Sequence, residues 1–228
     1  MPFAGFDSLS YPKDPVMAWL KANTNFSFVG FYLAPAPSRP DSDWMDRRST
    51  LSAQGWGFAP VYVGQQEPNQ PGSHILTPQQ GEIDARDAAG LMTTAGFPAG
   101  SVVYLDIEQG GALSPATSAY VKAWVETLAG LKSFTPGVYC SHSTAATLVK
   151  AVGVVRIWTW NLIDLAPQSP TFPTADPSGS GVAQAVLWQH AQNKSIAFTG
   201  GPVKSLAIDL DCASVPDPSQ PPATNPGT

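Results

Sequence analysis

Charged residues are scarce in this chain of 228 residues. Only 13% of them are Asp, Glu, Lys or Arg, against about a quarter in an average protein, and the net charge is -5. No run of Lys or Arg interrupts the sequence. A protein that binds nucleic acid needs such a basic patch, so the composition argues against a nucleic-acid partner.

Long apolar runs and cysteines are also lacking. No segment approaches the roughly 18 to 20 apolar residues of a membrane-spanning helix, and the start, MPFAGFDSLS, lacks the basic and apolar regions of a Sec signal peptide. We therefore expect a soluble protein that does not insert into membranes. Cys140 and Cys212 are too few for a disulfide scaffold or a zinc site, so we expect two unlinked, buried thiols.

Hydrophobic residues make up 43% of the chain, which suffices for a large core, and they are arranged in short runs. These runs predict eight strands, and helical patterns separate the first six of them. The clearest helix begins near Ser114, and another begins at Thr77, each with proline in its first turn. The strands are expected near residues 3–7, 27–33, 57–64, 101–108, 135–140, 154–160, 184–190 and 205–211. The helices are expected from Asp14, near 42–53, from Thr77 to 95, from Ser114 to 129 and near 143–150.

Strands that alternate with helices pair in parallel through right-handed crossovers. Eight of them fit a TIM-type β/α barrel with about five helices better than an open sheet. Prolines between residues 164 and 183 disfavour further helices, so loops should join the last strands. Residues 1–213 would then form the barrel domain, and residues 214–228 a proline-rich tail or linker.

Acidic residues end three of the predicted strands. Asp106 and Glu108 end the run SVVYLDIE, and they share one face because successive side chains of a strand point to opposite faces. Asp7 follows the first run in GFDS, and Asp209 and Asp211 end the last run in SLAIDLDC. The first and last strands of a closed barrel are neighbours, so we expect these acids to flank one mouth at the carboxyl ends of the strands.

Clustered carboxylates suit glycoside hydrolysis. Mutual repulsion and partial burial raise at least one pKa, so one group stays protonated near neutral pH as a general acid while another stabilises the cationic transition state. Glu108, the longer acid and the one nearer the mouth, is the expected general acid. The competing interpretations are a structural network of acids bonded to backbone amides and a Mg²⁺ or Ca²⁺ site, although we expect no cofactor and no metal.

Aromatic and amide side chains near the predicted strand ends would complete a sugar site. Flat rings pack against sugar faces, and an amide hydrogen-bonds a hydroxyl group or a carboxylate. Trp158 is a further aromatic residue near a predicted strand end. For each of these rings, the competing interpretation is an ordinary position in the hydrophobic core. The expected substrate contacts are Tyr32, Tyr62, Tyr139, Trp160, Gln189 and Asp211.

The motifs GFDS, PVYVGQQ, DARDAAGLMTTAGFPAGSVVYLDIE, GVYCS, VRIWTWN, LWQ and IDLD occur in a characteristic order. In this order they resemble a bacterial glycoside-hydrolase-like family known as domain of unknown function 1906. The resemblance runs from about residue 3 to residue 213 and is most specific between Asp84 and Glu108. That family is similar in turn to the family 25 glycoside hydrolases, the lysozyme-type muramidases. The resemblance implies their fold, a barrel of eight strands with only five helices.

Carried over by position, the resemblance implies that Glu108 is the muramidase acid and Asp106 its neighbour, with Asp7 and Asp209 as the acids of the first and last strands. Asp106 or the substrate's own acetamido group would stabilise the cationic intermediate. Two departures bear on the substrate subsites. His190 follows WQ where the muramidases usually have Tyr, and YVGQQ replaces their third-strand aromatic motif.

Two functions of different classes follow. The first is a glycosidase that cuts peptidoglycan between N-acetylmuramic acid and N-acetylglucosamine, in the manner of a cell-wall-degrading effector or lysin. It would be made in the bacterial cytoplasm and exported to the cell envelope by a route other than Sec. The second is a non-catalytic glycan-binding or structural barrel in a secretion-like or phage-like particle. The C-terminal tail would join the barrel to a targeting domain or particle component. Metal-dependent hydrolysis is a third, weaker alternative.

Overall fold

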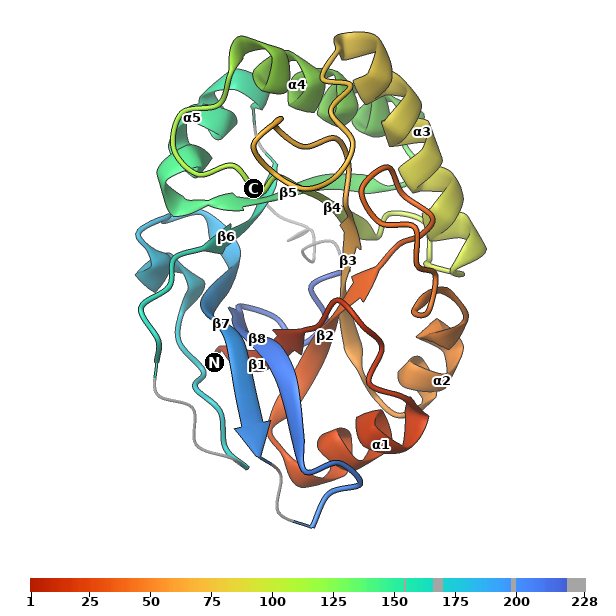
Figure 1. Ribbon diagram of the computed structural model, residues 1–228, viewed down its shortest axis with the longest axis vertical. Coiled ribbons are helices and arrows are strands. Elements are labelled where there is room, and N and C mark those ends of the chain that lie inside the picture. The colour runs from red at the N-terminus through yellow and green to blue at the C-terminus, as the bar shows by residue number, and fades with distance from the viewer. Residues whose placement is uncertain (154, 166–169, 198–199, 221–228) are drawn as a thin grey trace, which may run out of the picture.

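The computed structural model describes residues 1–153, 155–165, 170–197 and 200–220. These residues form eight strands that close into a barrel in chain order (Figure 1), which confirms the expected fold class. The strands are β1 (Phe3–Asp7), β2 (Phe26–Tyr32), β3 (Gly57–Tyr62), β4 (Val102–Asp106), β5 (Thr135–Ser141), β6 (Arg156–Trp160), β7 (Ala185–Ala197) and β8 (Ser205–Ala213).

Five α-helices in the described part of the chain pack outside the barrel. They are α1 (Asp14–Asn23), α2 (Arg48–Ala53), α3 (Pro78–Thr94), α4 (Pro115–Leu131) and α5 (His142–Val152). Two short 3-10 helices, Met45–Arg47 and Pro177–Ser180, accompany them. Helices α3, α4 and α5 gather on one side of the ring, and α1 and α2 on another (Figure 1). The described residues between β6 and β7 lie mostly in loops, as the prolines predict.

Local sequence explains where the longest helices begin. The Thr77 hydroxyl accepts a hydrogen bond from the Gln80 amide at 3.1 Å, and the Ser114 hydroxyl accepts one from the Thr117 amide at 3.1 Å. Each cap precedes a proline at the first helical position, where no backbone donor is needed. The capping signals read from the sequence are therefore confirmed.

Strand β8 runs antiparallel to both of its neighbours, β1 and β7. The connection between Ala197 and Ser205 is too short for a parallel crossover, which needs a dozen or more residues, so β7 and β8 form a hairpin. Both Asp209 and Asp211 are expected at the mouth end of the last strand, but only Asp209 lies there, so the expectation for Asp211 is corrected. Asp209 pairs with Asp7, whereas Asp211 pairs with Gly5 and lies deeper in the barrel.

Side chains fill the barrel interior below the mouth. Ten of them form one apolar cluster: Phe28, Ala59, Val61, Val63, Val102, Tyr104, Tyr139, Trp158, Leu187 and Ala213. Two glycines make room for the rings. A Cβ at Gly5 would lie 2.4 Å from the ring of Phe28, and one at Gly137 would lie 2.6 Å from the ring of Tyr104. The interior is a packed core, so chemistry on a large substrate is confined to the mouth.

The residues that follow β8 cross the end of the barrel opposite the mouth. Asp217 Oδ1 accepts a hydrogen bond from the Phe58 amide at 3.0 Å, and Ser219 O accepts one from the Val102 amide at 2.6 Å. The Tyr104 hydroxyl donates to Pro218 O at 3.2 Å, and Ser219 is buried. This strap, residues 216–220, provides acceptors for one amide near the start of β3 and one at the start of β4. The domain division at residue 213 stays a prediction, and residues 221–228 of the expected tail lie outside the described residues.

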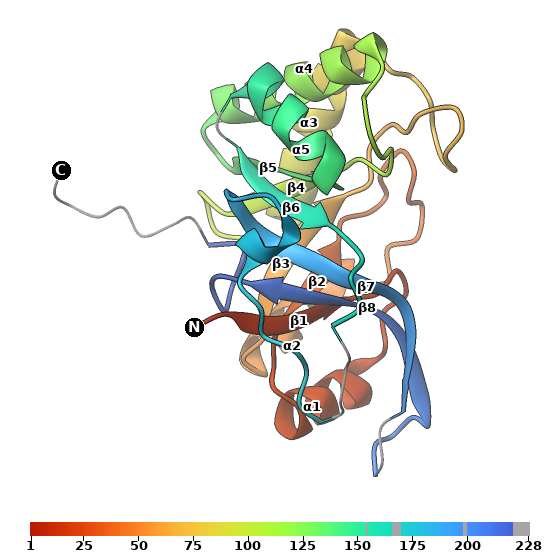
Figure 2. The ribbon, with the colours of Figure 1, turned by 90° about the vertical axis from the view of Figure 1, so that its left-hand side faces the viewer.

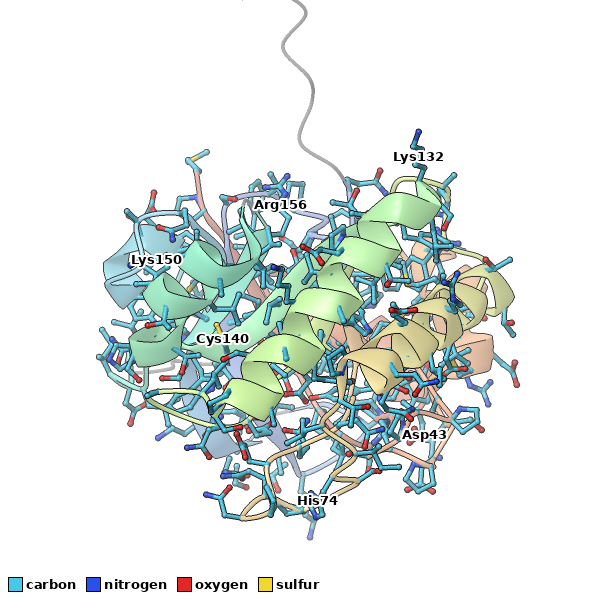
Figure 3. The ribbon with its side chains drawn as sticks, turned by 90° about the horizontal axis from the view of Figure 1, so that it is seen from above. Asp43, His74, Lys132, Cys140, Lys150 and Arg156 are labelled. Carbon is cyan, nitrogen blue, oxygen red and sulfur yellow. The ribbon has the colours of Figure 1, made fainter. Side chains whose placement is uncertain are left out.

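Both thiols, Cys140 and Cys212, are buried and unlinked. Cys140 lies on β5 beneath α4 and α5 (Figure 3). None of the helices in the described ranges has the length and apolar composition to cross a bilayer.

The strap yields a test of stability. Asp217→Ala leaves the buried Phe58 amide and the Ser219 amide without their acceptor, which should lower the free energy of unfolding by about 1 to 3 kcal/mol. Urea titration followed by tryptophan fluorescence measures the change. Asp41→Ala, which removes the same charge from an exposed position, is the matched control and should change it by less than about 0.5 kcal/mol. Equal effects of the two variants would contradict a stabilising role for the strap.

Candidate active site

Two adjoining pockets open at the mouth, and they share Asp7, Tyr32 and Asp209. The acid pocket, of about 50 Å³, is lined by Asp7, Tyr32, Val61, Asp106, Glu108, Tyr139, Trp158, Gln189, Gln192 and Asp209. The groove, of about 450 Å³, is lined by residues 8–12, Asn193 and residues 206–208 in addition to the shared three. All four expected catalytic acids, from β1, β4 and β8, thus meet in one pocket.

Asp7 lines the acid pocket and is 3% exposed. Its Oδ1 accepts a hydrogen bond from the Tyr32 hydroxyl at 2.7 Å, and its Oδ2 accepts one from Gln189 Nε2 at 2.7 Å. Burial raises the pKa of Asp7, and these donors oppose the rise. Gly30 on β2 is required beside it, because a Cβ there would lie 2.5 Å from the Cβ of Asp7.

Asp106 and Glu108 form a carboxyl pair in which one member is buried and the other reaches solvent. Burial, the charge of Glu108 and the charge of Asp7 raise the pKa of Asp106 well above its ordinary value. Partial desolvation by the pocket, followed by the charge of Asp7, also raises the pKa of Glu108. The neighbouring Glu108 carboxyl contributes to the raised pKa of Asp106, whereas Asp106 holds back the rise in the pKa of Glu108.

Asp209 and Asp211 differ in their access to solvent. Asp209 lines both pockets and accepts a hydrogen bond from the Asn193 amide at 2.6 Å, and burial followed by the charge of Asp7 raises its pKa to about 7. Asp211 is 1% exposed, accepts a hydrogen bond from Trp158 Nε1 at 3.0 Å and lines neither pocket. The structure therefore does not place Asp211 as a substrate contact, because β8 descends into the barrel after Asp209.

Tyr32, Tyr139 and Gln189, which the sequence predicts near the acids, line the acid pocket. The Tyr139 hydroxyl donates to Gln189 Oε1 at 2.9 Å, and the amide of Gln189 in turn donates to Asp7. Burial and the neighbouring acids raise the pKa of both tyrosines, so their phenols stay neutral donors. Gln192 Nε2 completes this network by donating to Gln189 Oε1 at 2.7 Å.

Tyr62 and Trp160 lie apart from the acids. Tyr62 is completely buried outside the barrel wall, where its hydroxyl donates to Asp87 of α3 at 2.9 Å, so the expected substrate contact is corrected. Its neighbour Val61 points into the acid pocket instead. Both faces of this strand are apolar, so alternation alone did not reveal which face points inward. Trp160 is partly exposed at the end of β6 and lines neither pocket.

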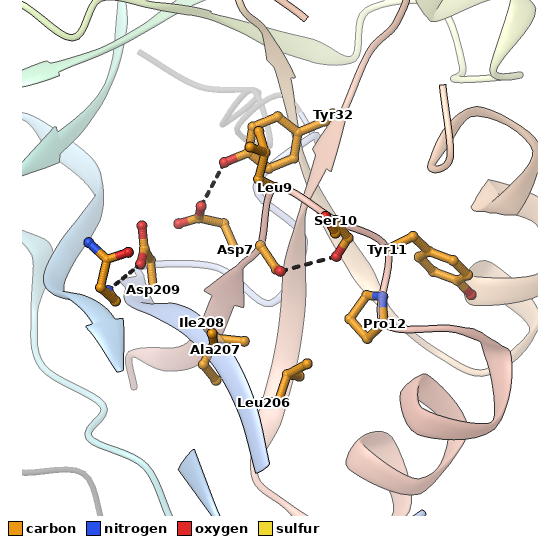
Figure 4. Close-up of a pocket in the computed structure, with 12 residues that line it drawn as sticks. Asp7, Leu9, Ser10, Tyr11, Pro12, Tyr32, Leu206, Ala207, Ile208 and Asp209 are labelled. Carbon is orange, nitrogen blue, oxygen red and sulfur yellow. Dashed lines mark hydrogen bonds between the residues drawn. The ribbon is translucent and has the colours of Figure 1, made fainter. Parts of the chain in front are cut away.

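The groove lies between the loop that follows β1 and the hairpin of β7 and β8. Figure 4 shows Leu206, Ala207 and Ile208 on one side of it and Ser10 and Pro12 on the other. The hairpin projects beyond the mouth (Figure 2). Gln192 and Asn193 lie beyond residue 190, where the seventh strand was expected to end, so the sequence did not reveal them as lining residues. Tyr11 gave no signal because a single ring in a loop carries no pattern.

The ionisable groups that line the mouth are acidic. Both pockets contain carboxyl groups, and no Lys, Arg or His is among the described residues that line them. An anionic ligand would therefore be repelled, whereas a neutral or cationic one would be accepted. Within the described ranges, no three His, Cys, Asp or Glu side chains are arranged to hold a metal ion. The site fits acid-base chemistry on a neutral group.

Comparisons with known proteins agree with this fold. A family model described as "Rv2525c-like, glycoside hydrolase-like domain" matches residues 18–208. No curated protein matches the sequence.

Several solved structures are similar to this chain. The catalytic domain of endolysin ply40 from bacteriophage P40 of Listeria monocytogenes is 14% identical, with a TM-score of 0.63 over 94% of each chain. The Mycobacterium tuberculosis Tat-secreted protein Rv2525c, in complex with L-tartrate, is 14% identical, with a TM-score of 0.59 over 92% of this chain and 94% of that one. A family 25 glycosyl hydrolase from Bacillus anthracis is 11% identical, with a TM-score of 0.56 over 93% and 89%. At these identities the likeness concerns the fold.

The raised pKa of Asp209 gives a test of its surroundings. Between pH 3.8 and about pH 7, Asp209 is ionised in the unfolded chain but stays protonated in the folded protein. This group therefore makes the free energy of unfolding fall as the pH rises through that range. Asp209→Asn should weaken this fall in the free energy of unfolding, measured by urea titration between pH 4 and pH 8. The exposed Asp41→Asn is the control. A variant whose curve runs parallel to that of the wild type would contradict the burial of this carboxyl.

Proposed function

The chain belongs to the Rv2525c-like, glycoside hydrolase-like domain family, and from this premise we propose that it is a glycosidase acting on the glycan of peptidoglycan. One observation carries the proposal. Four carboxyl groups from β1, β4 and β8 line one pocket, and the pKa of each is raised. Such a cluster holds protons near neutral pH, which is what cleavage of a glycosidic bond requires.

Glu108 is proposed as the general acid because it is the member of the pair that reaches solvent. It gives its proton to the leaving glycosidic oxygen as the bond from that oxygen to the anomeric carbon breaks. The negative charge left on the pair, together with Asp7, then faces the positive anomeric centre. Asp106 or the acetamido group of the sugar stabilises this centre until water adds to it and returns a proton to Glu108.

The groove supports a polymeric substrate. It continues from Asp7 and Asp209 between the loop after β1 and the hairpin, so a glycan that enters the acid pocket has a path along which further sugars extend. Leu9 and Leu206 offer apolar surface, and Ser8 and Ser10 offer hydroxyl groups, which together suit N-acetylated sugars. The similarity to an endolysin catalytic domain supports peptidoglycan, cut between N-acetylmuramic acid and N-acetylglucosamine.

A non-catalytic glycan-binding module is the second candidate. It is favoured by the small volume of the acid pocket, about 50 Å³, which admits a sugar ring only if side chains at the mouth move. Export to the cell envelope by a route other than Sec is part of the first candidate, and a relative described as Tat-secreted supports it. Hydrolysis of cell walls separates the two candidates.

The first prediction from this proposal concerns Glu108. Glu108→Gln removes the transferable proton with little change in shape, so turnover on purified cell walls should fall by at least about 100-fold. Loss of turbidity and release of reducing ends measure the rate. Glu82→Gln, at an exposed position of α3, is the matched control and should keep the wild-type rate. Equal activity of Glu108→Gln and the wild type, or none from either, would remove the enzyme proposal.

The second prediction concerns Asp106. Asp106→Asn offers a fixed amide donor to Glu108 in place of a carboxyl, which favours the ionised form of Glu108 and depletes its acid form. Turnover should again fall by about 100-fold or more, and the basic limb of the pH-rate profile should move to lower pH. A variant that is folded by circular dichroism and cleaves at the wild-type rate would refute the role of Asp106.

A further inference from the structure

The chain around Glu108 lacks an ordinary neighbouring strand on one side. β4 ends at Asp106, and Glu108 lies two residues beyond it. Towards β5 the ladder continues, because the Ile107 amide donates to Tyr139 O at 3.0 Å. Towards β3 the pairing ends with Tyr62 opposite Leu105. The backbone groups of Asp106 and Glu108 on that side therefore need partners from elsewhere.

Gln66 supplies these partners with its side chain. Its Nε2 donates to Asp106 O at 2.9 Å, and its Oε1 accepts a hydrogen bond from the Glu108 amide at 3.2 Å. The carboxamide thus offers the donor and the acceptor that a peptide group of a continued β3 would have offered. Gln66 is 2% exposed and lines neither pocket, so it does not reach a substrate.

Gln66 is itself held from both sides. The backbone amide of Gln66 donates to Ser73 O at 2.7 Å, and the backbone carbonyl oxygen of Gln66 lies 3.0 Å from His74 Nδ1. The loop it belongs to passes close to Ser38, since a Cβ at Gly72 would lie 2.2 Å from the Ser38 hydroxyl oxygen. These contacts leave the carboxamide little freedom to turn away from Glu108.

Gln65 anchors the same loop on the opposite side. Its Nε2 donates to Asp84 Oδ2 at 3.1 Å, and its Oε1 accepts a hydrogen bond from the Ile75 amide at 2.9 Å. Asp84, buried on α3, also accepts a hydrogen bond from the Tyr120 hydroxyl at 2.8 Å. The two adjacent glutamines of PVYVGQQ therefore point to opposite sides, one to the helices and one to the acids.

We propose that Gln66 is a positioning residue that holds the backbone of Glu108 so that its carboxyl stays beside that of Asp106 in the acid pocket. The inference rests on the proposed function for its catalytic consequence, but the clamp itself is a structural claim that can be tested without activity. Without the clamp, the segment after β4 is held only by β5, and the two carboxyls lose their fixed separation. A displacement of about 1 Å at a reacting group can cost about 100-fold in rate.

Amide hydrogen exchange tests the clamp directly. In the wild type the Glu108 amide should be protected at least about 10-fold relative to an unstructured peptide, although the Glu108 side chain is exposed. In Gln66→Met, which keeps the side-chain length but has no amide, exchange at Glu108 should be at least about 10-fold faster. Asn69→Ala, at an exposed position of the same loop, is the matched control and should leave it unchanged. An unprotected Glu108 amide in the wild type, or equal exchange in Gln66→Met, overturns the clamp.

Kinetics test the positioning role. Gln66→Met should lower kcat on cell walls by about 10-fold to 100-fold while KM changes by less than about threefold, because the substrate does not touch Gln66. Gln66→Glu keeps the acceptor for the Glu108 amide but adds negative charge, so the basic limb of its pH-rate profile should move to higher pH. If Gln66→Met does not fold, the pH-rate profile of Gln66→Glu tests the positioning role in its place.

The two failures are distinguishable. If the wild type cleaves no glycan, the proposed function fails, while hydrogen exchange at Glu108 still decides the clamp. If the Glu108 amide exchanges faster in a folded variant that keeps the wild-type kcat and pH profile, the clamp exists but does not position the acid, and the inference is overturned. Faster exchange together with a lower kcat supports it.

Discussion

The antiparallel pairing of β8 with β1 is the constraint on which the site depends. It closes the barrel and sets Asp209 beside Asp7, while Asp211 lies below them. A parallel β8 would have needed a crossover helix and would have carried its acids past the mouth. Because the strand descends from the mouth, one of its acids borders both pockets and the other is sealed among interior side chains.

Desolvation then gives the acids their chemistry. Carboxyl groups this close cannot all be ionised in a buried setting, so protons stay on some of them near neutral pH. The neutral donors Tyr32, Gln189 and Trp158 offset part of the cost without bringing in a positive charge. One oxygen each of Asp106 and Asp211 is buried without a hydrogen-bond partner among the described residues. Buried polar atoms without partners lower stability, and sites that bind or react with a ligand commonly keep such atoms.

The two ends of the barrel have different tasks. The strap of residues 216–220 satisfies strand amides at one end, and the loop after β1, the residues after β4 and the hairpin of β7 and β8 line the pockets at the other. Outside the wall, the buried Asp84 links the helices to the loop that carries Gln65 and Gln66. The hydrogen-bond pattern of the sheet is continued by the side chain of Gln66, where β3 has already turned away from β4.

Much of the secondary structure can be predicted from local patterns in the sequence. Alternation placed Asp106 and Glu108 on one face, caps marked α3 and α4, and prolines predicted loops before β7, because each of these depends on neighbours in the chain. Only the tertiary structure decided the direction of β8, the outward face of Tyr62 and the clamp of Gln66. Those features depend on which segments pack together, and both faces of an inner strand are apolar, so no periodicity in the chain records the choice.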